Sequence, residues 1–303
     1  MKILFEENEL TFDELTGTLF TEKKVSVSIA RLDKIHPEVS GNKLFKLHYF
    51  LQQAIHQKNK PVLTFGGAYS NHLAAVSYAC GMIGLRSIAM VRGERQVILS
   101  HTLKQCELNG MELNFISRAA YSGKDSLHFK EELKQQFGDC MIIPEGGYHP
   151  LGADGASLIM DKLVHRNATH TCTAIGTATT IAGLVKNNPG NTTIIGIPVL
   201  KDMHDLQDRI SYLCEGTGFK NPEIFDNFHF GGYAKKTKGL IHFMNDFFSE
   251  YGIPTDFVYT AKMMYAVMDK IRAGYFPEGS NIICLHTGGL QGNDSLEKSA
   301  LLF

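Results

Sequence analysis

The chain has 303 residues, of which 44% are hydrophobic and 20% charged, and its formal net charge is −1. These values are typical of a globular chain with one large domain or two of ordinary size, and they give no broad attraction to nucleic acid or an anionic membrane. No apolar run is long enough to span a bilayer, and the start MKILFEENEL turns acidic too soon for a secretory signal.

The six cysteines form no CxxC pair, and the 13 histidines make no ligand-spaced cluster with them. A chain of this size does not need disulfides for stability. We therefore expect reduced thiols, a cytoplasmic location and no metal site.

Short apolar runs rich in β-branched residues alternate with helix-length segments along the chain. The candidate strands are VSVSIAR (25–31), PVLTF (61–65), SIAMVRG (87–93), ELNFIS (112–117), CMIIP (140–144), HTCTAI (170–175), TTIIGIPVL (192–200) and NIICLH (281–286). Near-continuous apolar strands joined by helices predict a doubly wound α/β protein with parallel sheet covered on both faces. In such a fold, ligands bind beyond the carboxyl ends of the strands.

The stretch SGNKLFKL opens the first long amphipathic helix. Leu44, Leu47 and Leu51 fall on one face, Lys43 lies in the first turn, and Lys46 follows nearly one turn later. The positive end of the helix dipole disfavours a cation at this position. Lys43 is therefore either a solvated surface residue or a lysine with a chemical role.

Four loops that follow predicted strands contain candidate ligand-binding residues. They are TFGGAYSNHLAA (64–75), IPEGGYHPLGADGA (143–156), AIGTATTIAGL (174–184) and ICLHTGGLQG (283–292). In the first loop, Ser70 and Asn71 open a helix whose free N–H groups favour a carboxylate, although either residue could simply cap the helix. The second loop could be only a connection.

The third loop has the form of a phosphate cradle. Gly176, Thr177 and Thr180 can present N–H groups and hydroxyls at a helix start, although the loop has fewer glycines than such cradles usually carry. The fourth loop ends an apolar strand at Thr287, where the ring of a ligand would be contacted.

The segments SGNKLFKL, TFGGAYSNH, IPEGGYHPLGADG, FHFGGYAK, DFVYTAK and LHTGG occur in this order. Together they resemble the 1-aminocyclopropane-1-carboxylate deaminase/D-cysteine desulfhydrase family of pyridoxal 5′-phosphate enzymes, which have the tryptophan synthase β-subunit fold, or fold type II. The resemblance runs from about residue 25 to 292. It implies two doubly wound domains with mostly parallel sheets, a large one of residues 1–42 and 148–303 and a small one of 43–147. The active site would lie in the cleft between them, and the protein would be a homodimer.

The resemblance also assigns roles to individual residues. Lys43 would form the Schiff base with the cofactor aldehyde and later act as the proton-transfer base, and the helix start and Lys46 would help to keep its amine nucleophilic. The other contacts implied for the substrate are Ser70, Asn71, His72, Tyr233 and Tyr259, of which Ser70, Tyr233 and Tyr259 are also catalytic; those implied for the cofactor are Asn71, Gly176, Thr177, Ala178, Thr179, Thr180 and Thr287.

The cradle departs from the family pattern, which usually reads GTGGT. Ala178 and Thr179 stand where that pattern has glycines. If either position requires a positive φ, the side chain is strained, and we expect this of Thr179 in particular. The sequence thus predicts weaker cofactor binding than in a relative with GTGGT, and tighter binding when glycine is restored at both positions.

Two threonines bear on the substrate. Family members that open the cyclopropane ring tend to have Glu after the VY tyrosine and Leu before the paired glycines, where this chain has Thr260 and Thr287. The chain therefore resembles the desulfhydrases, which convert D-cysteine to pyruvate, ammonia and hydrogen sulfide. Two alternatives remain open: deamination of 1-aminocyclopropane-1-carboxylate to 2-oxobutanoate and ammonia, and a non-catalytic protein that binds the cofactor or an amino acid.

Overall fold

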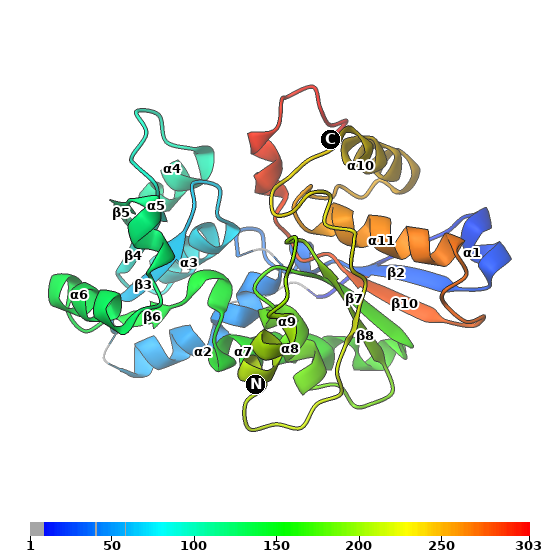
Figure 1. The fold of residues 1–303 in the computed structure, drawn as a ribbon, viewed down its shortest axis with the longest axis horizontal. Coiled ribbons are helices and arrows are strands. Elements are labelled where there is room, and N and C mark those ends of the chain that lie inside the picture. The colour runs from blue at the N-terminus through cyan, green and yellow to red at the C-terminus, as the bar shows by residue number, and fades with distance from the viewer. Residues whose placement is uncertain (1–8, 40, 58) are drawn as a thin grey trace.

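The computed structural model describes residues 9–39, 41–57 and 59–303, so Ser40 of the SGNK stretch lies outside the described residues. The strands form two sheets, a six-stranded one in the order β1-β2-β10-β7-β8-β9 and a four-stranded one in the order β5-β4-β3-β6. The pair β1–β2 is antiparallel, whereas the other described pairs are parallel. Figure 1 shows the two sheets side by side, with α2 and α7 between them along the lower edge.

Every predicted strand has a counterpart in the structure. The six-stranded sheet contains β1 (Phe12–Leu15), β2 (Ser26–Ala30), β7 (His170–Ile175), β8 (Thr193–Pro198), β9 (Glu223–Ile224) and β10 (Asn281–Leu285). The four-stranded sheet contains β3 (Val62–Gly66), β4 (Ser87–Arg92), β5 (Glu112–Ile116) and β6 (Met141–Ile143). The prediction of an α/β fold with mostly parallel sheets is confirmed, although β1 and β9 were not predicted.

Helices connect most of these strands. They are α1 (Thr18–Lys23), α2 (Asn42–His56), α3 (Asn71–Met82), α4 (His101–Leu108), α5 (Arg118–Ser122), α6 (Leu127–Phe137), α7 (Pro150–Leu163), α8 (Thr179–Lys186), α9 (Leu206–Leu213), α10 (Lys238–Tyr251) and α11 (Thr260–Arg272). None of these described helices is both long and apolar enough to cross a membrane.

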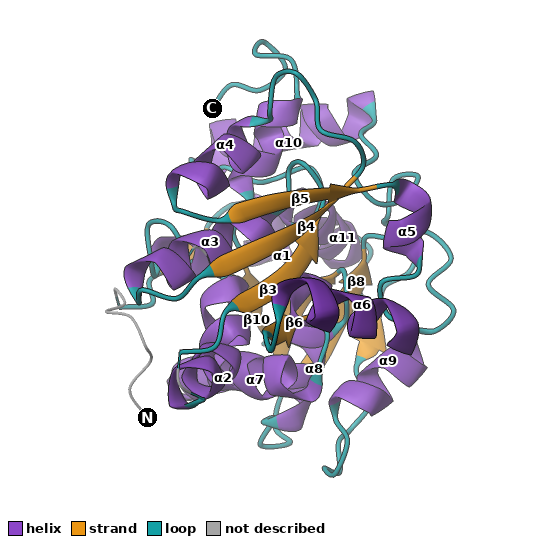
Figure 2. Cartoon of the chain, turned by 90° about the vertical axis from the view of Figure 1, so that its left-hand side faces the viewer, coloured by secondary structure: helices purple, strands orange, loops and turns teal. Residues whose placement is uncertain are grey.

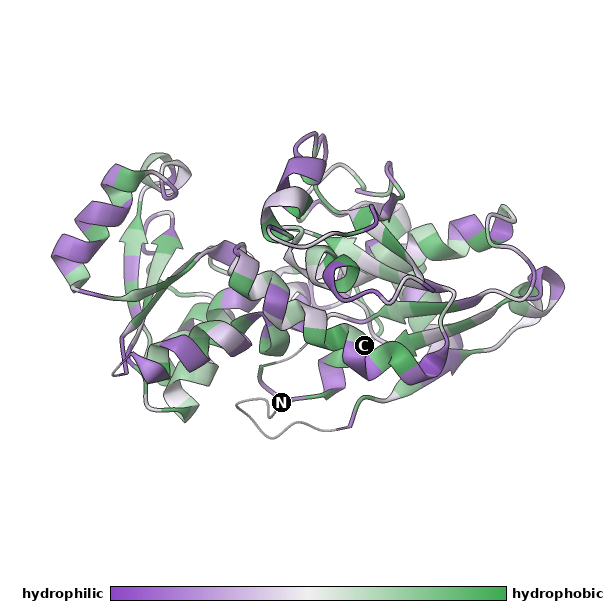
Figure 3. Cartoon of the chain, turned by 90° about the horizontal axis from the view of Figure 1, so that it is seen from below, coloured by the Kyte–Doolittle hydropathy of each residue, from purple (hydrophilic) through white to green (hydrophobic). Residues whose placement is uncertain are grey.

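The apolar core lies on both faces of each sheet. One continuous cluster packs α2, α3, α7 and α8 against one face of both sheets, and it includes Val62 of β3 and Ile175 of β7. A second cluster packs α1 and α11 on the other face of the six-stranded sheet. A third cluster packs α6 on the other face of the four-stranded sheet. Figure 2 shows α3 and α6 on opposite sides of the four-stranded sheet, and Figure 3 shows the hydrophobic colour along the strands.

Helix α2 begins where sequence analysis placed it. Leu44, Leu47 and Leu51 are buried in the shared cluster, so the amphipathic face predicted for this helix is its packed face. Gly41 precedes the helix with φ 70°, and a Cβ at this position would lie 1.9 Å from the carbonyl oxygen of Thr287. Only glycine allows that conformation and that approach together. The close packing brings Lys43 beside the carboxyl end of β10.

Candidate active site

Lys43 lies in the first turn of α2, and its Nζ donates a hydrogen bond of 2.8 Å to Asn42 Oδ1. Loss of hydration in the protein interior lowers the pKa of Lys43 from its ordinary 10.5 to about 8, while the carboxylate of Asp256 acts in the opposite direction. The sequence predicted a lowered pKa but attributed it to the helix dipole and Lys46. Burial is the main cause, and it leaves an appreciable fraction of neutral amine near pH 8.

Asn42 connects Lys43 to the predicted phosphate cradle. Its Oδ1 accepts the bond from Lys43, and its Nδ2 donates to Thr180 Oγ1 at 2.7 Å. Because Asn42 is only 6% exposed, both of its bonds are shielded from water. Sequence analysis gave Asn42 no role, although its place in the GNK motif between a glycine and the candidate lysine was a usable signal.

Lys46 is a buried lysine, with 5% of its surface exposed. It has no ion pair among the residues that the structure describes, and burial together with the charge of Lys43 lowers its pKa well below 10.5. A Cβ at Gly147 would lie 3.4 Å from Lys46 Cβ, and one at Gly152 would lie 3.2 Å from the Thr179 side chain. Lys46 therefore lies near the cradle, as an unpaired amine whose charged form a bound anion would favour.

The cradle joins β7 to α8, and the strain in it lies at Ala178. Ala178 precedes α8 with φ 68°, whereas Thr179 is the first helical residue and has no positive φ. The prediction that Thr179 would be strained is therefore wrong. Its side chain is fully buried, and its hydroxyl lies 2.9 Å from that of Thr177. No side chain caps α8, so its first N–H groups are free to bind an anion.

Ser70 and Asn71 begin α3 at the carboxyl end of β3. Ser70 Oγ accepts from the Leu73 N–H at 3.3 Å, which is the capping contact that the sequence left open, and the serine hydroxyl can still donate. Asn71 Oδ1 is buried and has no hydrogen-bond partner among the residues that the structure describes, and a Cβ at Gly289 would lie 2.6 Å from Asn71 Nδ2. The asparagine thus packs against the turn that follows Thr287.

His72 is 3% exposed, and its Nε2 lies 2.8 Å from Thr64 Oγ1 in β3. Thr64 donates its own hydrogen to the Ile143 carbonyl, so His72 Nε2–H must be the donor to Thr64. Burial and the nearby Lys43 and Lys46 lower the pKa of His72 to about 3, which keeps the ring neutral. The structure places this side chain between α3 and β3, where it supports the loop, and the substrate contact implied by the resemblance stays a prediction.

The two predicted tyrosines meet. Tyr233 Oη and Tyr259 Oη are 3.4 Å apart, and their rings pack edge to face. Burial raises the pKa of both phenols, so both stay protonated near neutral pH and can donate protons. Lys262, which is fully buried in α11, donates to the Gly232 carbonyl at 2.8 Å and so fixes the turn that carries Tyr233. A Cβ at Gly176 would lie 3.1 Å from the Tyr259 ring, which places the pair beside the cradle.

The two threonines that pointed to the substrate differ in availability. Thr260 Oγ1 donates to Asp256 Oδ2 at 2.6 Å and accepts from the Asp256 N–H at 2.8 Å. Its hydroxyl is therefore engaged in hydrogen bonds that stabilise the start of α11. Thr287 is 8% exposed, and its hydroxyl makes no hydrogen bond to the described residues. Of the two, only Thr287 has a hydroxyl that is free to contact a ligand.

The residues present fit pyridoxal phosphate. A primary amine of lowered pKa, the buried unpaired Asn71 Oδ1 and the free Thr287 hydroxyl lie around one place, and the cradle and the unpaired Lys46 lie next to it. The amine matches the aldehyde of the cofactor, Asn71 and Thr287 match its polar aromatic ring, and the cradle with Lys46 matches its phosphate. Lys43, Asn71 and Thr287 would hold the ring end of the cofactor, and Lys46 with the N–H groups of the Gly176–Thr180 loop would hold the phosphate.

The fold and this set of groups define an enzyme that uses pyridoxal phosphate, and comparison with known proteins agrees. Residues 19–288 match the family described as pyridoxal-phosphate dependent enzymes, so the chain belongs to that family. The narrower resemblance to the 1-aminocyclopropane-1-carboxylate deaminase/D-cysteine desulfhydrase group is also confirmed by similar proteins.

Three similar proteins illustrate this group. A Pyrococcus abyssi protein, provisionally named a 1-aminocyclopropane-1-carboxylate deaminase, is 28% identical over 89% of this chain and 86% of its own length. An Arabidopsis thaliana protein named as a bifunctional, mitochondrial D-cysteine desulfhydrase/1-aminocyclopropane-1-carboxylate deaminase is 29% identical over 90% of this chain and 75% of its own. The crystal structure of an ACC deaminase homologue superposes with a TM-score of 0.81, at 27% identity over 94% of this chain and 90% of that one.

Proposed function

We propose that the protein is a D-cysteine desulfhydrase-like lyase that converts a β-thio amino acid to pyruvate, ammonia and a thiol. The observation that carries the proposal is the free hydroxyl of Thr287, whose backbone packs against Gly41 just before Lys43, at the position where ring-opening relatives tend to have leucine. Pyridoxal phosphate, when bound, supplies the aldehyde that captures the substrate amine and a ring that stabilises negative charge at Cα. A neutral hydroxyl near this ring suits β-elimination, because a thiolate leaves readily and needs little further stabilisation.

The residues of the site then have distinct tasks. The Ser70 hydroxyl and the N–H groups at the start of α3 would bind the substrate carboxylate. Lys43 Nζ, released by the incoming amine, would remove the Cα proton, since its lowered pKa makes it a base near neutral pH. The protonated Tyr233 and Tyr259 would stand on the substrate side and donate a proton to the departing sulfur. The released aminoacrylate hydrolyses to pyruvate and ammonia.

A substrate panel tests this proposal. Purified protein with pyridoxal phosphate is given D-cysteine, L-cysteine, D-serine and 1-aminocyclopropane-1-carboxylate, and 2-oxo acid formation is measured. We expect the highest kcat/KM for D-cysteine, because this ratio measures discrimination between substrates. Borohydride reduction followed by peptide mapping should place the pyridoxyl group on Lys43, and a label on Lys46 or Lys262 would refute the assignment.

Replacement of Thr287 tests the observation directly. Thr287→Leu should lower kcat/KM for D-cysteine by about tenfold or more, because it removes one hydrogen bond to a polar group at the reacting centre. Thr287→Ser keeps the hydroxyl and should retain most of the activity. If the leucine variant matches the wild type, Thr287 does not contact the reacting system. Thr260→Glu is a poorer test, because it would bring a second carboxylate against the buried Asp256.

Deamination of 1-aminocyclopropane-1-carboxylate is the second candidate. The paired hydroxyls of Tyr233 and Tyr259 favour it, because a protonated phenol could deliver a proton to the carbon released by ring opening. The names of the similar proteins include this activity. The third possibility, a binding protein without catalysis, is set aside because the chain belongs to a family of enzymes.

We also propose a homodimer and a cytoplasmic location. The dimer is an expectation from the family resemblance, and light scattering with size-exclusion chromatography would test it. All six cysteines are free, and five of them are buried, which supports a reducing compartment. Fractionation of the source cells would test the location.

A further inference from the structure

The structure contains a pocket that the site described above does not use. Its volume is about 520 Å³, and its lining residues are Arg92, Arg118, Tyr121, Ser122, Lys124 and Glu145. Arg92 is the last residue of β4, Arg118 lies just after β5, and Glu145 lies just after β6. The pocket thus lies at the carboxyl edge of the four-stranded parallel sheet, which is the edge where open α/β sheets bind ligands.

Positive charge predominates in this pocket. Lys124 forms ion pairs with Glu145 at 3.6 Å and with Asp125 at 3.4 Å, so the Glu145 carboxylate already has a partner. Arg92 and Arg118 have no ion pair among the described residues. Two uncompensated guanidinium groups at one pocket favour a carboxylate, which they can bind through paired hydrogen bonds.

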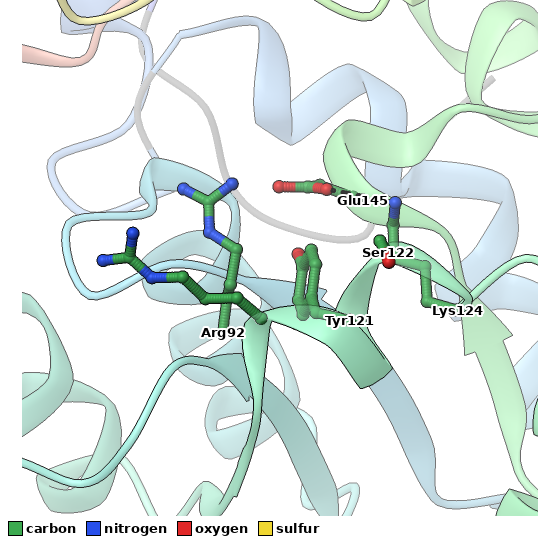
Figure 4. A pocket seen from close by; sticks show the side chains of 6 residues that line it. Arg92, Tyr121, Ser122, Lys124 and Glu145 are labelled. Carbon is green, nitrogen blue, oxygen red and sulfur yellow. Dashed lines mark ion pairs between the residues drawn. The ribbon is translucent and has the colours of Figure 1, made fainter.

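Tyr121 adds an unused hydrogen-bond donor. Its side chain is only 4% exposed, and its hydroxyl makes no hydrogen bond of normal geometry to the described residues, although the Glu145 carboxylate lies near it. Burial and the nearby Glu145 raise the pKa of Tyr121, so the hydroxyl stays protonated. Figure 4 shows the ring between the side chains of Arg92 and Lys124. The distances from the ring centroid to their charged groups are 5.6 and 5.1 Å. A buried donor without a well-placed acceptor is costly, and an anion in the pocket would supply an acceptor of better geometry.

The pocket borders the candidate active site on two sides. A Cβ at Gly67, in the loop that leads to Ser70, would lie 3.5 Å from Arg92 Nη2. A Cβ at Gly146, next to Glu145, would lie 2.8 Å from the side chain of Thr177 in the cradle. A substrate whose α-carboxylate is held near Ser70 could therefore extend its side chain toward Arg92.

We propose that this pocket is a subsite for a second carboxylate, and that the substrates are β-thio D-amino acids whose leaving group carries an acid. The inference rests on the proposed β-elimination. For S-carboxymethyl-D-cysteine, the base takes the Cα proton and the Cβ–S bond breaks with its electron pair on sulfur. The sulfur then takes up a proton and leaves as mercaptoacetate. Water hydrolyses the remaining aminoacrylate to pyruvate and ammonia, so no oxidant or reductant is needed.

A matched pair of substrates tests the subsite. S-Carboxymethyl-D-cysteine and its amide, S-carbamoylmethyl-D-cysteine, have nearly the same shape and differ by one charge. We expect kcat/KM to be at least tenfold higher for the acid, which is the size of effect that hydrogen bonds to a charged group produce. Arg118→Gln and Tyr121→Phe should each reduce this ratio. Arg95→Gln, which removes an exposed arginine paired with Glu107, should leave the ratio unchanged.

A binding experiment separates this inference from the proposed function. The probes are 3-(carboxymethylthio)propanoate and its terminal amide at the carboxymethyl end, which lack the amine and cannot react. Calorimetric titration should give a dissociation constant at least tenfold lower for the diacid, and Arg118→Gln should abolish the difference. If this holds but no amino acid is turned over, the proposed function is wrong and the subsite stands. If D-cysteine is turned over but neither matched pair shows a preference for the acid, the subsite is wrong and the function stands.

Discussion

Lys43 is a lysine whose surroundings make it reactive before any ligand is present. With a pKa of about 8, roughly a tenth of its amine is neutral at pH 7, whereas a lysine of ordinary pKa would have less than a thousandth. The rate at which apoprotein takes up pyridoxal phosphate should therefore rise from pH 6 to about pH 8 and level off above it. Stopped-flow absorbance would measure this rate. A rate that keeps rising up to pH 10 would contradict the lowered pKa, and Lys43→Arg is the control without a competent amine.

The same burial has a cost for the apoprotein. Since the pKa of Lys43 is lower in the folded chain than its ordinary 10.5, the unfolded chain binds more protons between pH 8 and 10.5, and stability gains with rising pH in that window. Below pH 8 the amine is charged while it is buried, so the folded chain bears the full free-energy cost of its lost hydration. Lys43→Met should thus raise the melting temperature of apoprotein at pH 7, with an advantage that shrinks toward pH 10.5. Lys24→Met, at an exposed lysine paired with Glu278, should change it little at either pH.

Residue types and order were sufficient to single out Lys43, the two tyrosines and the loops around them as candidates, because each lies in a local motif of the family resemblance. Their roles stay predictions. Other features depend on contacts that the motifs do not encode. His72 is bonded to a threonine in the neighbouring strand, so its motif position said nothing of its burial. The hydroxyl of Thr260 is taken by Asp256, only four residues away, and an Asp-x-x-x-Thr pattern at a helix start could have indicated this capping contact.

The turn between β7 and α8 shows how one element tolerates an unfavourable residue. Ala178 has a left-handed backbone, which costs about 1 kcal/mol for a residue with a Cβ, and Thr179 begins the helix with a hydroxyl bonded to Thr177. Ala178→Gly should therefore stabilise the protein by about 1 kcal/mol and tighten cofactor binding severalfold. The measurements are the free energy of unfolding and titration of apoprotein with pyridoxal phosphate.

Thr179→Gly is the matched control at the neighbouring position. It removes a buried hydroxyl contact and places glycine in a helix, so it should destabilise the protein by about 1 kcal/mol. The double glycine variant should then have a free energy of unfolding close to that of the wild type. If both single variants raised the free energy of unfolding equally, the backbone strain would be shared between Ala178 and Thr179.

Among the larger elements, the strands with continuous apolar runs were predicted well because both faces of a parallel strand are buried. β1 and β9 lack this signal. β1 pairs antiparallel at a sheet edge and reads FDEL, which is only partly buried, and β9 has two residues. The start of α2 was predicted from its amphipathic face, but the contact of Gly41 with Thr287 joins segments that are distant in sequence and could not be predicted.

At the scale of the whole molecule, the pocket lined by Arg92, Arg118 and Tyr121 exists only because the chain crosses between parallel strands. Arg92 ends β4, whereas Arg118 and Tyr121 lie in α5 after β5, and no motif contains two of the cations that line the pocket. The carboxyl ends of predicted parallel strands could have indicated Arg92, the last residue of β4, as a candidate ligand contact. The orphaned hydroxyl of Tyr121 could not be predicted, since it depends on side-chain geometry.

The apolar cluster that α2, α3, α7 and α8 share with both sheets has a calorimetric consequence. A chain with two sheets often melts in two steps, each sheet absorbing heat at its own temperature. Here neither sheet can lose its packing without exposing surface that belongs to the other. A differential scanning trace should therefore show one endotherm whose van't Hoff and calorimetric enthalpies agree. Lys43 lies on α2, and α2 packs in this cluster. Saturation with pyridoxal phosphate should therefore move the whole endotherm to higher temperature without splitting it. Two resolved peaks, or a shift of only part of the trace, would mean that the sheets unfold independently.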